Sequence, residues 1–179
     1  LNYHQKPIIG VVLIPERDEL WISYDKTIRC EKSDGSRKEI FLPREKNLNK
    51  MTLVSSKNHR NNKLEDLVRK INFKKVVVMG SIGCKIASIL RGESDIYISL
   101  SLPGKSSPKD WDFAAPEAIL SAAGGAITNL DNREISYGKA NFEQRGILIA
   151  SNNYLIHEKI CSEIKEIMIK NKLYPLYSS

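Results

Sequence analysis

Three short segments combine residue types that can bind a phosphate or a metal ion. The first is KDWDFAA, residues 109–115, where Asp112 stands near the start of a predicted helix. A carboxylate there can ligate Mg²⁺, and the free N–H groups of a helix start attract an anion or a phosphate. Pro116 supports this placement, because proline is tolerated in the first turn of a helix. The alternative, which spacing alone favours, is that Asp110 or Asp112 only caps the helix.

The second segment is GSIGCK, residues 80–85, which follows an apolar strand and opens a predicted helix. Glycines allow a ligand to approach the backbone closely, and the Ser81 hydroxyl can donate to an anion. Lys85 lies one helical turn later, on the same face as Ser81. The segment lacks the GxxxxGK[ST] pattern of a nucleoside-triphosphate loop, and a glycine-rich turn without a ligand explains it equally well.

The third segment is SSKNHR, residues 55–60, a polar and cationic stretch at the exit of a predicted strand, where ligand-binding loops usually lie. His59 can donate a hydrogen bond to a phosphate or a base, although a lone histidine is more often an ordinary surface residue. His4 and His157 have no acidic or cysteine partner at ligand spacing, and we assign them no chemical role. The histidine hypothesis therefore depends on His59 alone.

Strands and helices that alternate along the chain must bring these segments together. The apolar run 8–14 and LWISY, residues 20–24, flank a Pro-Glu-Arg-Asp turn and predict a hairpin, and two short strands flank the turn 33–35. Further elements are predicted in this order: a strand at 51–56, a helix with apolar positions from Leu64 to Ile71 after the capping candidates Asn61 and Asn62, a short buried strand at 76–79, a helix with apolar positions from Ile82 to Leu90, a strand at 95–100, a helix that ends before Gly124, a strand at 146–150 and a helix from about 153 to 170. Such an order predicts layered α/β packing.

The polar, aperiodic stretch 43–51 divides the chain into two predicted parts. Residues 1–45 are expected to form the end of a first α+β domain built on antiparallel strands, and residues 46–179 a second α/β domain that carries the three segments. The chain begins with a strand-like stretch at Leu1 rather than with Met, which suggests a piece of a longer protein.

The composition is that of an ordinary soluble globular protein. Of the 179 residues, 41% are hydrophobic and 27% are charged, which excludes a mainly disordered chain. No apolar run reaches the ~20 residues of a membrane-spanning helix and no signal-peptide pattern opens the chain, so we predict a cytoplasmic protein without membrane insertion. Cys30, Cys84 and Cys161 are far apart and lack metal-ligand spacing, so we expect reduced thiols with structural roles.

The net charge of +7 is concentrated in one segment. Residues 26–75 carry fifteen basic and six acidic side chains, so the rest of the chain is slightly acidic. Such a segment attracts polyanions or small, multiply phosphorylated ligands. A solvated basic face is the more common explanation, and the aromatic residues that single-stranded nucleic acid needs for stacking are not interleaved with these lysines. We therefore expect no nucleic-acid partner.

The order of the three segments resembles that of a known family. WDFAAPEAILSAAGG, residues 111–125, is similar to the carboxy-terminal signature of the inositol monophosphatase superfamily, which implies a Mg²⁺-dependent phosphatase with a layered αβαβα sugar-phosphatase-type fold. SKNH, GSIGCK and KDWDFAAPEAI together look most like the 3'(2'),5'-bisphosphate nucleotidase, or CysQ-type, branch, and the resemblance covers residues 10–152. It implies conversion of 3'-phosphoadenosine 5'-phosphate to AMP and phosphate, which clears a by-product of sulfate assimilation.

This resemblance implies roles for four residues. Asp112 corresponds to the family's aspartate that binds Mg²⁺ next to the scissile phosphate, and is therefore both a metal ligand and part of the substrate site. Ser81 and Lys85 correspond to the pair that holds the other phosphate, and His59 to the histidine that contacts the nucleotide. Ser99 stands where some relatives carry an arginine, which leaves the choice of substrate more open.

Two metal-binding motifs of the family, a Glu-Glu pair and DPxDGT, precede the GVV strand in relatives and are missing from this chain. Because Mg²⁺ needs several placed oxygen ligands, the resemblance implies a fold incomplete at the N-terminus, with no catalytic residue of its own and little activity. The intact protein is expected to be an enzyme that binds a small phosphorylated nucleotide and can form a homodimer. The alternatives are a phosphatase of inositol phosphate or another small monoester, and a non-catalytic phosphate-binding module.

Overall fold

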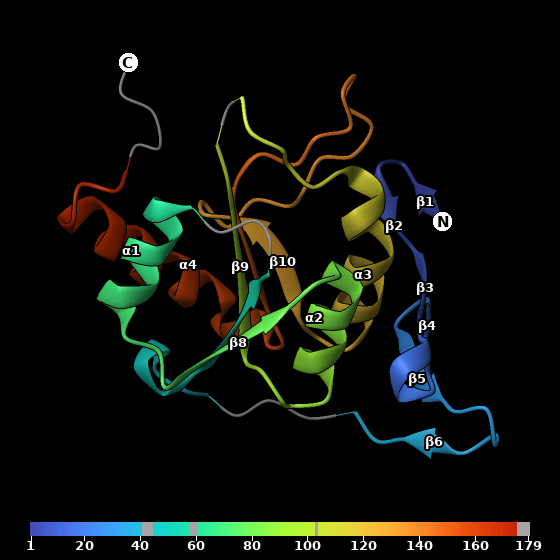
Figure 1. Ribbon diagram of the computed structural model, residues 1–179. Coiled ribbons are helices and arrows are strands. Elements are labelled where there is room, and N and C mark those ends of the chain that lie inside the picture. Colours follow the sequence, from blue (N-terminus) through green and yellow to red (C-terminus); the bar gives the residue numbers. More distant parts are fainter. Residues whose placement is uncertain (41–44, 58–60, 103, 175–179) are drawn as a thin grey trace.

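The protein is described here by a computed structural model of residues 1–40, 45–57, 61–102 and 104–174 (Figure 1). Its strands are β1 (Asn2–Tyr3), β2 (Lys6–Pro7), β3 (Ile9–Ile14), β4 (Glu19–Tyr24), β5 (Thr27–Glu31), β6 (Arg37–Lys38), β7 (Thr52–Ser56), β8 (Lys75–Met79), β9 (Ile96–Ser101), β10 (Ala126–Asn129) and β11 (Gly146–Ser151). Its helices are α1 (Asn62–Ile71), α2 (Ile82–Leu90), α3 (Asp110–Ala122) and α4 (Tyr154–Lys170), with short 3₁₀ turns at Pro15–Arg17 and Leu48–Lys50.

Two large sheets and two pairs of helices are stacked in four layers, and β1 and β2 form a separate two-stranded antiparallel sheet. The sheet β3-β4-β5-β6 is antiparallel, whereas the sheet β10-β11-β9-β7-β8 is mixed, with β8, β7 and β9 parallel. Helices α2 and α3 lie between the two sheets, and α1 and α4 cover the other face of the five-stranded sheet (Figure 1). The predicted layered α/β class is confirmed. Among the helices in the described part of the chain, none is long and apolar enough to cross a membrane.

The central strand β9 shows why the layers stack in this way. Tyr97 belongs to the core shared with α2 and α3, while Ile96, Ile98 and Leu100 belong to the core shared with α1 and α4. This division follows from the two-residue period of a strand, which sends alternate side chains to opposite faces. Every residue of β9 is buried, as expected for a strand that has a helical layer on each side.

The predicted ends of the helices are confirmed by their capping contacts. The Asn61 side chain accepts a hydrogen bond from the Leu64 N–H at 3.0 Å, and Asn153 accepts one from the Leu155 N–H at 3.0 Å. Both contacts satisfy N–H groups that a helix start leaves free. Gly124 follows α3 with a φ of +84°, a conformation that glycine adopts without a side-chain clash.

One predicted element is present but in a different environment. The VVVM run was expected to be a buried strand, yet β8 lies at the edge of the five-stranded sheet, and Val76 and Val78 are exposed. An apolar run does not reveal whether another layer will cover it, because that depends on which strands pair. The prediction of a strand here is confirmed, and the prediction that it is buried is wrong.

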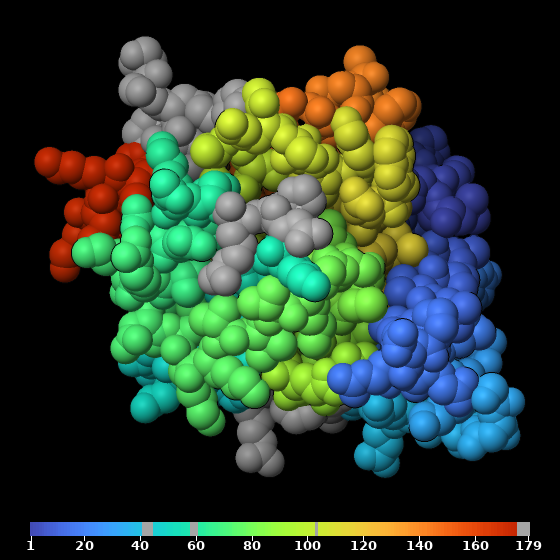
Figure 2. Space-filling view, viewed as in Figure 1, coloured from blue at the N-terminus to red at the C-terminus, as the bar shows by residue number. Residues whose placement is uncertain are grey.

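The stretch proposed as a linker is partly anchored. Within 43–51, Leu48 and Met51 are buried in the core beside α1 and α4, and a 3₁₀ turn joins them. The division into 1–45 and 46–179 stays a prediction. The two parts share one core, because Trp21 and Cys30 pack in the same cluster as Phe113, and Figure 2 shows the blue N-terminal residues against the yellow α3 segment.

Pro116 lies deeper in its helix than predicted. Helix α3 already begins at Asp110, so WDFAA does form its entering turn, but Pro116 follows in the second turn. A proline has no N–H, so it cannot donate to the Asp112 carbonyl four residues earlier. Helix α3 therefore carries a break in its hydrogen bonding directly after the segment that bears Asp112.

A buried carboxylate joins the four-stranded sheet to the end of α2. Glu19 on β4 accepts hydrogen bonds from Lys38 at 2.7 Å, Arg91 at 2.7 Å and the Trp21 indole at 3.0 Å. A buried charge is tolerated only when it is paired and hydrogen-bonded, as it is here. The polar residues of β4 therefore help to hold the sheet against the helices. All three cysteines are free thiols, as predicted.

Helix α3 approaches β3 closely at Gly10, and this contact yields a prediction. A Cβ at Gly10 would lie 2.6 Å from the Ala115 carbonyl oxygen and 2.9 Å from Ala118 Cβ. We expect Gly10→Ala to lower the free energy of unfolding by about 1–3 kcal/mol, because the helix must move away from the sheet. Urea unfolding measures the change. Gly80→Ala is the control, since a Cβ there meets no atom within 4 Å, and equal losses in both variants would contradict the close-packing argument.

The buried His157 predicts a loss of stability in acid. Its ring contacts the Ser151 hydroxyl at 2.7 Å and the Thr128 hydroxyl at 2.9 Å, and burial lowers its pKa to about 4. Between the unfolded value near 6.5 and this folded value, the unfolded chain binds a proton that the native protein does not. Stability therefore falls as the pH falls through this range, by roughly 3 kcal/mol in all.

Urea unfolding at several pH values between these two limits tests this prediction. The His157→Gln variant lacks the titrating ring, so it should bind up to one proton fewer on unfolding. The slope of its free energy of unfolding against pH should therefore be smaller than that of the unsubstituted protein. An unchanged pH dependence in the variant would show that other groups cause the acid sensitivity.

Candidate active site

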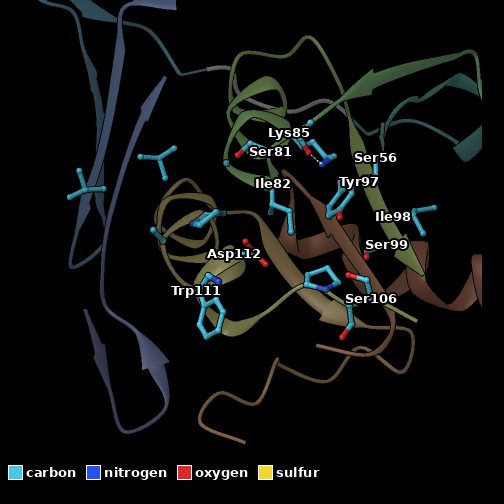
Figure 3. A pocket seen from close by; sticks show the side chains of 18 residues that line it. Ser56, Ser81, Ile82, Lys85, Tyr97, Ile98, Ser99, Ser106, Trp111 and Asp112 are labelled. Carbon is cyan, nitrogen blue, oxygen red and sulfur yellow. Dashed lines mark hydrogen bonds between the residues drawn. The ribbon is translucent and has the colours of Figure 1, made fainter. Parts of the chain in front are cut away.

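A cavity of about 540 Å³ brings residues of all three sequence segments together (Figure 3). Ser81, from the start of α2, lines it together with Lys85 one turn later and Asp112 from the first turn of α3. Figure 3 shows these three side chains around one hollow, with β9 forming a further wall. The helix starts and the strand therefore place a carboxylate, a hydroxyl and an ammonium in one cavity.

Asp112 is exposed in the cavity and has one oxygen engaged. The backbone N–H of Lys109 donates to Asp112 Oδ2 at 2.8 Å, so the capping role proposed as an alternative is real. The contact still leaves Asp112 Oδ1 without a hydrogen-bond partner among the residues that the structure describes, while the residue lines the cavity. Asp110 is different, because it is buried and accepts hydrogen bonds from another loop. Of the two aspartates, Asp112 is the one that can meet a ligand.

The glycine-rich turn is only partly explained by packing. A Cβ at Gly83 would lie 3.0 Å from Val12 Cγ1, so Gly83 allows β3 and α2 to pack together. Gly80 has no such neighbour, and it lines the cavity. Ser81 occupies the N-cap position of α2 but makes no capping hydrogen bond with its side chain, so its hydroxyl is available to a ligand.

Lys85 is the cation of this cavity wall and is almost fully buried, with 1% of its surface exposed. Its ammonium donates to the Gly80 carbonyl and lies 5.3 Å from the centre of the Tyr97 ring. Burial lowers the pKa of the ammonium to about 8, and the Asp112 carboxylate acts in the opposite direction. The group therefore remains mostly protonated at neutral pH, and an anion in the cavity would compensate its charge.

The third segment reaches the cavity at its beginning. Ser56, at the end of β7, lines the cavity, in agreement with a ligand-binding role for the exit of this strand. His59 lies outside the described residues, so its nucleotide-contacting role stays a prediction.

Three cavity residues were not predicted as a group. Tyr97 and Ser99 line the same wall because they lie two positions apart on β9, and Ser106 follows in the next loop. Burial raises the pKa of Tyr97 to about 12, so its phenol stays protonated. The alternation of IYISLS gives the signal that places Tyr97 and Ser99 on one face, although it does not reveal that this face meets a cavity.

The donor set suits a hard cation but supplies only part of a site. Mg²⁺ prefers carboxylate and other oxygen ligands, and Asp112 offers such an oxygen inside the cavity. Across residues 1–40, 45–57, 61–102 and 104–174, no group of three or more His, Cys, Asp or Glu could hold a metal ion. Asp112 can therefore supply one oxygen ligand, and a complete Mg²⁺ site would need further oxygen ligands.

The four layers of helices and sheets define an α/β protein of the sugar-phosphatase type. A family model described as "Inositol monophosphatase family" matches residues 1–168. The chain belongs to the inositol monophosphatase family, as its WDFAAPEAILSAAGG segment predicted.

Individual relatives agree with this assignment. The chain is 31% identical over 137 residues to 3'(2'),5'-bisphosphate nucleotidase 1 of Mus musculus, a match that covers 75% of this chain and 42% of the mouse protein. It is also 31% identical over 131 residues to 3'(2'),5'-bisphosphate nucleotidase CysQ of Buchnera aphidicola, covering 73% of this chain and 46% of that protein. The chain thus spans less than half the length of these relatives.

A solved structure shows the same fold. Staphylococcal IMPase-II superposes with a TM-score of 0.71 at 20% identity, and the match covers 95% of this chain and 63% of that one. At this level of identity the likeness concerns the arrangement of strands and helices. The predicted sugar-phosphatase-type fold is confirmed by it.

Proposed function

We propose that the protein carrying this chain is a Mg²⁺-dependent phosphatase that converts 3'-phosphoadenosine 5'-phosphate, or a closely related 3'(2'),5'-bisphosphate nucleotide, to the monophosphate and inorganic phosphate. The observation that carries the proposal is the presence of Lys85 and Ser81 in the same cavity as Asp112. A substrate with two phosphates needs two anion sites, and the cavity offers a cationic site apart from the carboxylate. The relatives named as bisphosphate nucleotidases support this choice.

In this proposal the residues of the chain have two roles, which are to bind the substrate and to orient it. The Lys85 ammonium and the Ser81 hydroxyl bind the phosphate that is not cleaved, and thereby fix the nucleotide in the cavity. Asp112 holds one ligand position next to the phosphate that is cleaved. When bound, Mg²⁺ supplies the positive charge that favours attack by water and stabilises the leaving oxygen. Water adds to phosphorus, the bond between phosphorus and the ribose oxygen breaks, and that oxygen ends as a hydroxyl.

Phosphate release tests this proposal directly. Using the protein with any residues that precede Leu1, release from 3'-phosphoadenosine 5'-phosphate and from inositol 1-phosphate is compared with Mg²⁺ and with a chelator. The proposal expects Mg²⁺-dependent release with a clear preference for the nucleotide. A preference for inositol 1-phosphate overturns the choice of substrate, and the absence of release from both overturns the phosphatase proposal in favour of a phosphate-binding module.

One observation supports the alternative substrate, a small phosphate monoester, which the same test addresses. Ser99 lines the cavity and is neutral, so the wall of β9 contributes no second cation. Among the described residues, Lys85 is the only lysine or arginine that lines the cavity. A cavity with one cation is less strongly selective for a bisphosphate than a cavity with two.

A further inference from the structure

A buried carboxylate next to the candidate metal ligand has no part in the function proposed so far. Asp110 is 8% exposed, and both of its oxygens accept short hydrogen bonds from one loop. The Gly138 N–H donates to Oδ2 at 2.6 Å, and the Gln144 side-chain amide donates to Oδ1 at 2.6 Å. Gln144 is itself 3% exposed and also donates to the Ser136 carbonyl at 2.8 Å. A buried carboxylate bonded in this way is held in one orientation.

Backbone contacts extend this attachment on both sides of Asp110. The Asp110 N–H donates to the Phe142 carbonyl at 2.8 Å, and the Gln144 N–H donates to the Pro108 carbonyl at 2.8 Å. The Lys109 ammonium also donates to Glu143 at 3.0 Å. Segment 136–144 is therefore fastened along the start of α3, at the two residues that precede Trp111.

This attachment reaches the Asp112 carboxylate through Lys109. Lys109 is held by the loop, and its backbone N–H donates to Asp112 Oδ2 at 2.8 Å. If the first turn of α3 shifts, the donor that orients the Asp112 carboxylate shifts with it. Mutation of a residue that hydrogen-bonds to a metal ligand typically changes metal affinity or activity by about 10–100-fold.

We propose that Asp110 is a positioning residue: by fastening segment 136–144 to the start of α3, it directs the Asp112 carboxylate into the cavity. The proposal rests on the proposed function for its catalytic meaning, since Asp110 does not line the cavity. It goes beyond a folding role because it predicts a change in cation affinity that is separate from a change in stability.

The test is Asp110→Asn in the protein with any residues that precede Leu1. An asparagine keeps the shape but turns an NH₂ group toward one of two N–H donors, so one of the two contacts is lost. We expect Mn²⁺ affinity, measured without substrate by titration calorimetry, to weaken about tenfold. The Mg²⁺ concentration that gives half-maximal phosphate release should rise by the same factor, while the KM for the nucleotide stays within about twofold.

Two further variants make the result decisive. Asp131→Asn removes an exposed carboxylate that pairs with Lys165 at 2.7 Å, and should leave Mn²⁺ affinity unchanged. Asp110→Asn combined with Gln144→Glu restores an acceptor opposite the new NH₂ group but gives up the donor to the Ser136 carbonyl, so it should recover only part of the lost affinity. If Asp110→Asn does not fold, Gln144→Met removes the amide that donates to Asp110 and to the Ser136 carbonyl, and the same tenfold weakening is expected for it.

The outcomes separate the two proposals. The positioning role is overturned if a folded Asp110→Asn or Gln144→Met variant has the same Mn²⁺ affinity and the same Mg²⁺ dependence as the unsubstituted protein. A weakening of Mn²⁺ binding that the Asp131→Asn control does not show supports it. If the unsubstituted protein binds Mn²⁺ but releases no phosphate from either substrate, the proposed function fails, and the Mn²⁺ comparison still decides the role of Asp110.

Discussion

Replacing Asp112 with Asn is expected to lower Mg²⁺-dependent phosphate release by on the order of 100- to 1,000-fold, the range typical for the loss of one preorganised electrostatic group. Asparagine has the same shape, and its side-chain oxygen can still accept the hydrogen bond that the Lys109 N–H now gives to Asp112. The substitution therefore removes a negative charge from the cavity while it keeps the helix cap. The measurement is kcat/KM for 3'-phosphoadenosine 5'-phosphate at saturating Mg²⁺, together with thermal unfolding.

A matched control distinguishes a local effect from a general change in charge. Asp66 lies on α1 and pairs with Arg69, away from the residues that line the cavity, so Asp66→Asn should keep near-normal activity. If Asp112→Asn retains activity within about threefold of the unsubstituted protein, Asp112 is not a metal ligand. The capping interpretation then remains, and Asp112→Ala should reveal it as a loss of stability of about 1 kcal/mol.

The elements that could be predicted from the sequence are those whose signals are local. The turn between β3 and β4, the cap of α1, the start of α4 and the glycine that ends α3 each depend on a few neighbouring residues. The strand β10 was not predicted, because ITN is short and its polar flanks resemble a loop. The exposure of Val76 and the burial of Leu48 were missed for a different reason, since both depend on elements that are distant in the sequence.

The candidate site shows the same limit. The chemistry of Asp112, Ser81 and Lys85 could be proposed from residue type and spacing, and the fold places them at one cavity. The wall formed by Tyr97 could not be proposed, because a buried tyrosine in an apolar strand is usually an ordinary core residue. Contacts of segment 136–144 with α3 link residues about 30 positions apart, and no local pattern predicts which loop will pack on a helix start.

Replacing Lys85 with Met is expected to lower kcat/KM for the bisphosphate nucleotide by roughly 10–100-fold, as the loss of a charged hydrogen bond does. The same substitution should lower kcat/KM for inositol 1-phosphate by less than about threefold, because a substrate with one phosphate does not need the second anion site. Methionine has a similar volume, and among the described residues the buried ammonium bonds to the Gly80 carbonyl and faces the Tyr97 ring. Removing its charge should not destabilise the protein, since burial already disfavours that charge.

The pH dependence gives an independent measure of the same group. With a pKa of about 8, Lys85 loses its proton as the pH rises through this value, and the neutral amine no longer attracts the second phosphate. The kcat/KM for the nucleotide reports the free enzyme, so it should fall above this pKa, and the fall should be absent from Lys85→Met. Lys75→Met, at the exposed edge of β8, removes an equal charge outside the cavity and should retain both the activity and the pH profile. Equal losses for the nucleotide and for inositol 1-phosphate in Lys85→Met would show that Lys85 does not select a second phosphate, and would overturn the nucleotidase proposal.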